Sequence, residues 1–216
     1  MNLIKNVYKY GEKALVGDCN TYLVDDELCA LIDPGNPDYA RHRIDELKKD
    51  GFEVKDINLI LNTHSHPDHC GANQTFKDLS GARIALHRAE LEHLDLSKEF
   101  ARYFGMPLKE FKVDFYLEDK LNTGTNDFLI LHSPGHSPGS VALYCEKLKL
   151  LVCGDLIFEG GVGRTDFPGG SMRELKSSIE LVSKLDLEYL LPGHGNIIEG
   201  SKSIKRNFDF IKTYYF

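Results

Sequence analysis

The chain has 216 residues, 42% of them hydrophobic, and carries a net charge of −7 from 33 acidic and 26 basic residues. This composition suits a globular protein with a sizeable core, whereas the acidic balance argues against a nucleic-acid partner, which requires clustered lysine and arginine. Since the sequence also has neither an apolar run of roughly 18 residues nor a secretory signal at its start, we expect a soluble, cytoplasmic protein without a membrane partner.

In the first half of the chain, short apolar runs alternate with polar helical segments. Asp33-Pro34-Gly35-Asn36 is a strong turn signal, Gly51 is placed to end a helix, and Pro67 suits a first helical position. The segment 88–104, with Tyr103 and Phe104 near its end, either lines the entrance of a site or is an ordinary amphipathic helix. The expected strands are 7–10, 21–24, 28–32, 57–61 and 83–86, and the expected helices are 39–49, 67–79 and 88–104 (one or two pieces).

The second half begins with a strand-rich stretch. The expected strands are 113–117, 128–131, 141–145, 150–153 and 189–191, and the expected helices are 171–185 and 201–214. Two similar halves of this kind predict two sheets with helices outside. Because no repeat, low-complexity tract or Pro/Ser-rich linker divides the chain, we expect one domain over residues 1–216.

The five cysteines are odd in number and form no C-x-x-C pair, which argues against a disulfide framework. Cys29, Cys145 and Cys153 lie in apolar, strand-like runs and are expected to be buried. Cys70 directly follows His69 and is either a buried residue or a group that approaches a metal.

The stretch Thr63-His64-Ser65-His66-Pro67-Asp68-His69 contains four residues that can bind a metal. In an extended segment, residues two apart point to the same side, so His64 and His66 can share one ion. If the chain then turns into a helix, Asp68 and His69 project from its first turn and can serve a second ion. This spacing predicts a two-metal site.

Three later segments each place one metal-capable residue in a glycine-rich turn after a strand. They are Ser133-Pro134-Gly135-His136, Cys153-Gly154-Asp155 and Pro192-Gly193-His194-Gly195. Loops at strand ends carry function on a rigid scaffold, so these residues are placed to complete the site. The other histidines carry no such prediction: we expect His42, His87 and His93 to be solvated, and His132 to be either structural or a support for a ligand.

Together the seven side chains make two sites of about three ligands each. In this scheme His64, His66 and His136 hold the first ion, whereas Asp68, His69 and His194 hold the second. Asp155 bridges the two ions. Sites with three protein ligands leave a position for water, and two ions about 3.5–4 Å apart can hold a hydroxide between them. Imidazole and carboxylate ligands suit zinc, iron or manganese, and we expect two divalent ions, zinc first among these metals.

The motif at 63–69, followed in order by His136, Asp155 and His194, resembles the metallo-β-lactamase superfamily over nearly the whole chain. The resemblance implies an α+β fold: a four-layer αβ/βα sandwich with the metals at the edge between two mixed sheets. Three further segments are similar to short glyoxalase II-like hydrolases (hydroxyacylglutathione hydrolase-like). They are Leu31-Ile32-Asp33-Pro34-Gly35, the stretch 132–140, and the stretch 154–170 with its Gly163-Arg164-Thr165-Asp166-Phe167 run.

Several positions depart from other branches of this superfamily. Class B β-lactamases usually lack a bridging carboxylate, but Asp155 is present here. Related lactonases carry a tyrosine where this chain has Phe158, and flavodiiron proteins carry a glutamate where it has His66. Full-length glyoxalase II enzymes add a C-terminal helical domain that holds glutathione. This chain ends about 20 residues after His194, so we expect that domain to be absent and the glutathione specificity not to carry over.

The resemblance implies a metal-dependent hydrolase, a thioesterase that cleaves a small-molecule thioester such as S-lactoylglutathione through a metal-bridging hydroxide. A thiolate with an ordinary thiol pKa leaves without a separate general acid. Asp68 is the catalytic candidate beside its metal role, because it can accept a hydrogen bond from the hydroxide. Thr63 and Asp33 are candidates to orient ligands. The sequence does not identify substrate-binding residues or the oligomeric state.

The first alternative is an iron-dependent persulfide dioxygenase of the same fold, which would use His64, His136 and Asp155. A non-catalytic metal-stabilised module and an RNA phosphodiesterase are further alternatives, disfavoured by the open coordination positions and the acidic balance. For Arg164 and Asp166 we expect a salt bridge that braces their loop, with substrate contact as the other role.

Overall fold

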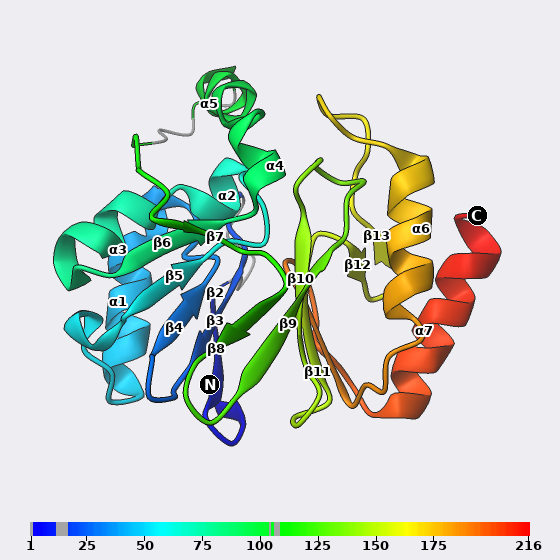
Figure 1. Ribbon diagram of the computed structural model, residues 1–216, viewed down its shortest axis with the longest axis horizontal. Coiled ribbons are helices and arrows are strands. Elements are labelled where there is room, and N and C mark those ends of the chain that lie inside the picture. The colour runs from blue at the N-terminus through cyan, green and yellow to red at the C-terminus, as the bar shows by residue number, and fades with distance from the viewer. Residues whose placement is uncertain (1, 12–16, 104, 106–108) are drawn as a thin grey trace.

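The computed structural model describes residues 2–11, 17–103, 105 and 109–216. Two mixed sheets pack face to face, and helices cover the outer face of each sheet (Figure 1). The first sheet runs in the order β1 (Asn2–Ile4), β2 (Val7–Gly11), β3 (Asn20–Val24), β4 (Ala30–Ile32), β5 (Leu59–Leu61), β6 (Arg83–Leu86) and β7 (Phe115–Tyr116). The second sheet runs in the order β15 (Ile198–Glu199), β14 (Tyr189–Pro192), β11 (Leu150–Gly154), β10 (Val141–Cys145), β9 (Asp127–His132) and β8 (Lys120–Asn122).

A small hairpin of β12 (Ile157–Phe158) and β13 (Gly161–Val162) follows β11. The α-helices are α1 (Ala40–Lys49), α2 (Pro67–Cys70), α3 (Asn73–Ser80), α4 (Arg88–Leu91), α5 (Leu94–Tyr103), α6 (Met172–Val182) and α7 (Ser201–Tyr214). Two single 3₁₀ turns, η1 (Pro37–Tyr39) and η2 (Val54–Asp56), complete the described elements. The four layers are helices, first sheet, second sheet and helices, as expected from the sequence.

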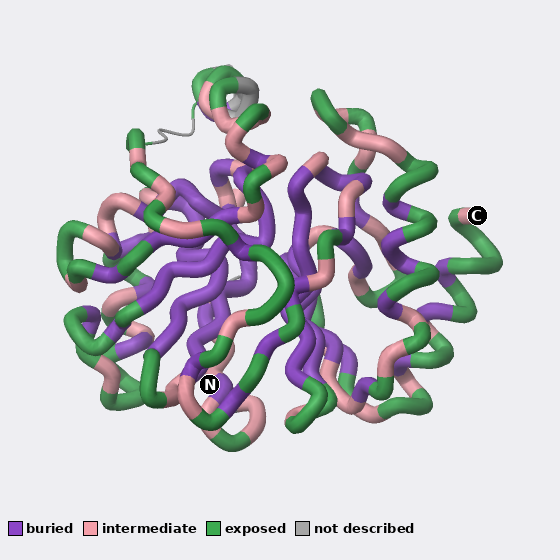
Figure 2. The backbone as a smooth tube through the Cα atoms, in the orientation of Figure 1, coloured by how far each residue is buried: buried purple, intermediate pink, exposed green. Residues whose placement is uncertain are grey.

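Three apolar clusters hold these layers together. One lies between the sheets, one between the first sheet and helices α1 and α3, and one between the second sheet and helices α6 and α7. Strand β4 shows the pattern: Ala30 and Ile32 join the cluster between the sheets, and Leu31 joins the helix-facing cluster. The sheet interiors are therefore buried on both faces (Figure 2), which explains the continuous apolar runs that predict these strands.

The helix predicted over 67–79 is instead two helices, α2 and α3. The break has a local cause, since the Ala72 N–H leaves the helical pattern and donates to the Gly35 carbonyl at 2.9 Å. A Cβ at Gly71 would lie 2.4 Å from the Pro67 carbonyl oxygen and 2.6 Å from Pro37 Cδ, so only glycine fits there. The hydrogen bond between Ala72 and Gly35 thus holds the turn after β4 next to the segment that carries Asp68 and His69.

Other differences from the expected elements are small. The segment 88–104 forms two helices, α4 and α5, while Phe104 lies outside the described residues. The sequence did not predict the short strands β1, β8, β12, β13 and β15, because two or three residues carry too little periodicity. All five cysteines are buried and free; the sequence predicted this burial for Cys29, Cys145 and Cys153. In the described part of the chain, every helix is too short or too polar to span a membrane.

Asp26, in the turn between β3 and β4, joins the two sheets. Its carboxylate accepts hydrogen bonds from the Thr123 hydroxyl at 2.8 Å, the Thr125 N–H at 3.0 Å and the Asn126 N–H at 2.9 Å. Partial burial acts to raise the pKa of Asp26, but the bonds led by those from Thr125 and Thr123 outweigh it and hold the pKa well below its usual value. The ionised carboxylate thus ties the β3–β4 turn to the β8–β9 turn.

We expect Asp26→Ala to lower the free energy of unfolding by about 1–3 kcal/mol at pH 7, since it leaves several donors without their acceptor. Because the pKa is lowered in the folded state, this contribution is present above the unfolded pKa of about 4 and is lost as the pH falls through the folded value. Urea unfolding at pH 7 and pH 3 measures both effects. Asp25→Ala is the matched control, and equal losses from the two variants at pH 7 would contradict the assignment.

Candidate metal centre

The seven candidate ligands converge at one edge of the sandwich. His64 and His66 follow β5, Asp68 and His69 lie in α2, and His136 lies between β9 and β10. Asp155 follows β11 and His194 follows β14. Strands β4, β5 and β6 are parallel, as are β11 and β14, so the loops after their carboxyl ends meet at the same edge. The sequence therefore identified side chains that the fold brings together.

The ligand atoms form three overlapping groups within 4.8 Å, namely His64/His66/His136, His64/His69/Asp155 and Asp68/His69/His194. The first and third groups coincide with the two ion sites that the sequence predicts. His66 Nδ1 lies 2.8 Å from His136 Nε2, and His69 Nε2 lies 3.2 Å from His194 Nε2.

Asp155 lies between the two groups. Its Oδ1 is 3.2 Å from His69 Nε2, and its Oδ2 is 3.4 Å from both His136 Nε2 and His194 Nε2. One carboxylate thus faces imidazoles of both candidate sites, the geometry that a bridging ligand requires. Gly193 makes this approach possible, since a Cβ there would lie 2.3 Å from Asp155 Oδ1 and 2.7 Å from His69 Cε1.

Three of the histidines are oriented through their outer ring nitrogen. His69 Nδ1 is 2.9 Å from Asp33 Oδ2, His136 Nδ1 is 2.7 Å from the Arg164 carbonyl oxygen, and His64 Nδ1 is 3.0 Å from Thr63 Oγ1. A proton on Nδ1 satisfies each contact, and Nε2 of each ring then faces the cluster. Metal-binding histidines are typically held in this way.

Thr63 and Asp33 form the support that the sequence suggested. Asp33 accepts from the Thr63 N–H at 2.8 Å and from the Thr63 hydroxyl at 2.6 Å, and its Oδ2 also contacts His69. The backbone of Asp33 has a positive φ of 51°, which aims the carboxylate inward from the Pro34-Gly35 turn. The buried Asp33 carboxylate therefore supports two candidate ligands: it contacts His69 directly and His64 through the Thr63 hydroxyl.

Two buried atoms in the cluster fit a cation. Among the described residues, His64 Nε2 and Asp155 Oδ1 have no hydrogen-bond partner, although the latter lies beside His69. An unpaired buried nitrogen or carboxylate oxygen is costly, and a metal ion would satisfy both. The donor set of imidazoles and carboxylates is suited to zinc, iron or manganese, so the residues present fit a dinuclear centre.

The charges of the cluster suit metal binding. Burial acts to raise the pKa of Asp155, but His194, His69 and His136 outweigh it and hold the pKa well below its usual value. Burial likewise opposes the ionised form of Asp68, whereas His69 and His194 lower its pKa to about 2. Burial and His136 lower the pKa of His66 to about 4. These carboxylates are therefore ionised and His66 is neutral at pH 7. Burial opposes the charged form of His194, but Asp155 and Asp68 outweigh it and raise its pKa to about 10. Burial of His69 is likewise outweighed, by Cys19, Asp155 and Asp68, and its pKa lies well above the usual value, so a metal ion would displace protons from both rings.

Aromatic side chains and an ion pair flank the cluster. The Phe167 ring lies 5.6 Å from the His66 ring, and the Phe158 ring lies 5.9 Å from the His194 ring. The Arg164 guanidinium stacks on Phe167 at 4.1 Å and forms a two-point salt bridge with Asp166, at 2.9 and 2.6 Å. The predicted salt bridge is therefore present.

The remaining cysteine and histidine hypotheses have different outcomes. Cys70 is buried and donates to the Ser65 carbonyl, and it belongs to none of the candidate ligand groups. His42 is exposed as expected, but His87 is half-buried and stacks on His132 with ring centroids 4.3 Å apart. His132 also contacts the Pro138 carbonyl oxygen at 2.9 Å, which favours the structural alternative.

The sequence missed residues that hold the His194 loop. Asn20 Nδ2 donates to the carbonyl oxygens of Pro192 at 2.9 Å and Gly195 at 3.0 Å, and the Tyr22 hydroxyl donates to Pro192 at 2.7 Å. Both side chains lie on β3, in the other sheet. No local motif marks such contacts, because they join positions more than 150 residues apart.

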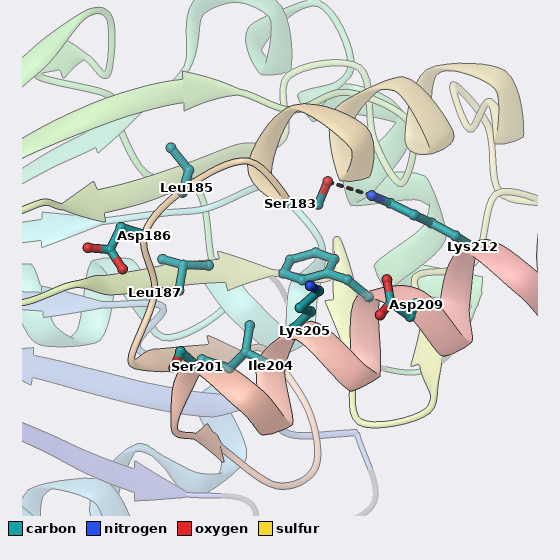
Figure 3. Close-up of a pocket in the computed structure, with 10 residues that line it drawn as sticks. Ser183, Leu185, Asp186, Leu187, Ser201, Ile204, Lys205, Asp209 and Lys212 are labelled. Atoms are coloured by element: carbon teal, nitrogen blue, oxygen red, sulfur yellow. Dashed lines mark hydrogen bonds between the residues drawn. The ribbon is translucent and has the colours of Figure 1, made fainter.

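A separate hollow of about 310 Å³ lies between the end of α6 and one face of α7 (Figure 3). Its floor includes Leu187, Ile204 and Phe208, and its rim includes Lys205 and Lys212, the latter bonded to Ser183. None of the seven candidate ligands lines it. This hollow is therefore not part of the metal centre.

Comparison with known proteins decides the family. The sequence profile described as the metallo-beta-lactamase superfamily matches residues 14–194. The chain belongs to the metallo-beta-lactamase superfamily. Both the resemblance and the αβ/βα sandwich expected from the sequence are thereby confirmed, and a metal-dependent hydrolase is the activity class of the named relatives.

Two curated relatives in this superfamily align over most of their length. A hydroxyacylglutathione hydrolase GloC from Haemophilus influenzae is 35% identical, over 83% of this chain and 85% of its own. A probable metallo-hydrolase, MJ0888, from Methanocaldococcus jannaschii is 34% identical, over 82% of this chain and 88% of its own.

Solved structures of superfamily members superpose on the chain. TTHA1623 in a di-iron-bound form has a TM-score of 0.75 and 32% identity, covering 89% of this chain and 93% of its own. The B3 metallo-beta-lactamase BLEG-1 has a TM-score of 0.80 and 31% identity, covering 94% of this chain and 96% of its own. A superfamily neighbour thus holds two ions on a similar fold.

We expect Asp155→Asn to lower the bound metal from two ions per chain to one or fewer, because a neutral amide cannot neutralise and bridge two cations. Metal content after dialysis, measured by plasma mass spectrometry, tests this. Asp166→Asn is the control, since that carboxylate is exposed and pairs with Arg164. Two ions retained by Asp155→Asn would show that the carboxylate is not a required ligand.

Proposed function

We propose that the protein is a metal-dependent thioesterase of the glyoxalase II type, acting on S-acyl thiols such as S-lactoylglutathione. The observation that carries the proposal is the seven-ligand cluster with Asp155 facing both halves. Similarity to the hydroxyacylglutathione hydrolase GloC supports the substrate class. Class B β-lactamases usually lack a carboxylate at this place, so Asp155 weighs against a β-lactamase.

In this proposal His64, His66 and His136 would hold the first ion. Asp68, His69 and His194 would hold the second, and Asp155 lies within reach of both groups. Two divalent ions, with zinc as the first choice, would supply a hydroxide at neutral pH and polarise the acyl carbonyl. The protein's part is to hold the seven ligand side chains next to one another.

Asp68 is the proposed catalytic residue. Its side chain is 23% exposed, whereas His69 beside it is fully buried, and its Oδ2 lies 3.3 Å from His194 Nε2. A carboxylate with a pKa of about 2 stays ionised and can accept a hydrogen bond from the attacking hydroxide and orient it, while the proton lost from the water passes to solvent. The departing thiolate needs no general acid, because an ordinary thiol has a pKa of about 8.5.

The Arg164–Phe167 stack is the proposed contact for the thiol carrier. Phe167 lies edge-on to the candidate ligand His66, and Arg164 presents a cation beside it, held by Asp166. An acyl group at the metals would therefore place its carrier next to an aromatic face and a positive charge. A carrier with a carboxylate, such as glutathione, suits this rim.

A second candidate is an iron-dependent persulfide dioxygenase. Two of the three ligands it requires, His64 and Asp155, are those whose buried ligand atoms lack a hydrogen-bond partner among the described residues. Together with His136 they form a two-histidine, one-carboxylate set. One iron per chain with oxygen uptake that depends on a thiol persulfide would favour this candidate over the thioesterase.

We expect the metal-loaded protein to hydrolyse S-lactoylglutathione, and His66→Ala to lower kcat/KM at least 100-fold because it removes a ligand of the first ion. Chelation should abolish the activity, and added zinc should restore it. Thioester loss followed by ultraviolet absorbance is the measurement. His42→Ala, which removes an exposed histidine, is the control. Full hydrolysis by His66→Ala would contradict the two-metal mechanism.

We expect Arg164→Ala to raise KM for S-lactoylglutathione about tenfold with little change in kcat, because the contact is with the carrier and not the reacting carbon. Steady-state kinetics with a thioester that lacks carboxylates should show a much smaller difference. Arg173→Ala, an exposed arginine on α6, is the matched control. An unchanged KM would show that Arg164 does not contact the thiol carrier and that its role is limited to the salt bridge with Asp166.

A further inference from the structure

Glu90 is a buried carboxylate that the metal ligands do not include. It lies in α4, its side chain is inaccessible to solvent, and it forms no ion pair with a described residue. A buried carboxylate without a cation costs several kcal/mol unless hydrogen bonds or nearby positive charge offset it. The groups around the Glu90 carboxylate must therefore compensate for its burial.

Four donors surround the Glu90 carboxylate. Oε2 accepts from the Ser65 N–H at 2.9 Å and from the Ser65 hydroxyl, whereas Oε1 accepts from the Ser137 hydroxyl at 2.5 Å and from the Gly139 N–H at 2.7 Å. Each oxygen thus takes one backbone N–H and one hydroxyl.

The two sets of donors come from the two loops of the first candidate ion site. Ser65 lies between His64 and His66, and Ser137 directly follows His136. One side chain therefore links the loop after β5 in the first sheet to the loop between β9 and β10 in the second sheet. The spacing of the three histidines depends on this link.

The fit around Glu90 is close. A Cβ at Gly139 would lie 2.5 Å from the Glu90 nitrogen and 2.6 Å from Glu90 Cγ, so glycine is required for the loop to reach the carboxylate. His87 accepts from the Ala89 N–H at 3.3 Å and caps α4, which fixes the helix that presents Glu90. The position of the Glu90 carboxylate is therefore fixed both by the capped helix that carries it and by the loop at Gly139.

We propose that Glu90 is a positioning residue for the first ion site: a buried anion that fixes the spacing of His64, His66 and His136 and whose charge favours a cation bound between them. The inference rests on the metal-binding part of the proposed function and not on the substrate. The four hydrogen bonds of Glu90 go to Ser65, Ser137 and Gly139, beside the ligands of the first site, so the Asp68/His69/His194 group should respond little.

Glu90→Gln tests the proposal with almost no change in volume. A serine hydroxyl can reverse and donate or accept, but a backbone N–H cannot, so the amide leaves either the Ser65 N–H or the Gly139 N–H facing another donor. We expect metal affinity at one of the two sites to fall about 10–100-fold, as is typical for supports of metal ligands. Affinity at the other site should stay within about threefold.

Competition titration with a chromophoric chelator gives the two dissociation constants, and the visible spectrum of the cobalt form reports the ligand field of each ion. Glu92→Gln removes an exposed charge from the same segment and should change neither constant. Ser137→Ala, which removes one donor but keeps the carboxylate, should shift the same constant in the same direction by a smaller factor and covers the case in which Glu90→Gln does not fold.

Two results would overturn the proposal: unchanged constants in Glu90→Gln, or equal weakening of both sites together with a lower melting temperature of the metal-free protein. The second result would reduce Glu90 to a general structural role. If wild-type protein does not bind two ions, the proposed function itself fails, and this outcome is distinct from a failure of the Glu90 inference.

Discussion

The candidate metal centre depends on a protein scaffold that keeps buried imidazole and carboxylate atoms close together, some of them without a hydrogen-bond partner. His64 Nε2 and Asp155 Oδ1 lack hydrogen-bond partners among the described residues, and imidazole nitrogens approach within 2.8 Å. Such a cluster is unfavourable by itself, because polar atoms lose water and lone pairs meet. Its cost is offset by the anchors on the outer side of the rings, such as Asp33 and the Arg164 carbonyl, and cations bound in the centre would offset it further.

The sandwich supplies these anchors from both sheets. The Thr63 carbonyl accepts from the Val141 N–H at 2.9 Å, and the Gly193 carbonyl accepts from the Asn20 N–H at 2.7 Å, so the ligand loops after β5 and β14 are each bonded to the opposite sheet. Glu90 adds a third such link through Ser65 and Ser137. A change in the relative position of the two sheets would therefore also change the geometry of the candidate ligands.

Sequence reasoning identified the seven candidate ligands that the fold brings together because each one lies in a motif or glycine-rich turn, and a strand period of two places His64 and His66 together. It also predicted the long, buried strands such as β10 and β11. It could not predict the break at Gly71, which a bond to Gly35 causes, or Glu90, which lies 25 residues from Ser65 in an ordinary helical segment. Those features are set by partners distant in sequence.

The central claim is that Asp155 joins two ions in a single centre. Crystals of the zinc-loaded protein, measured by anomalous diffraction at the zinc edge, test it most directly. We expect two peaks of comparable occupancy about 3.5–4 Å apart, both within bonding distance of the Asp155 carboxylate. A single peak held by His64, His136 and Asp155, with no ion beside Asp68, His69 and His194, would contradict it.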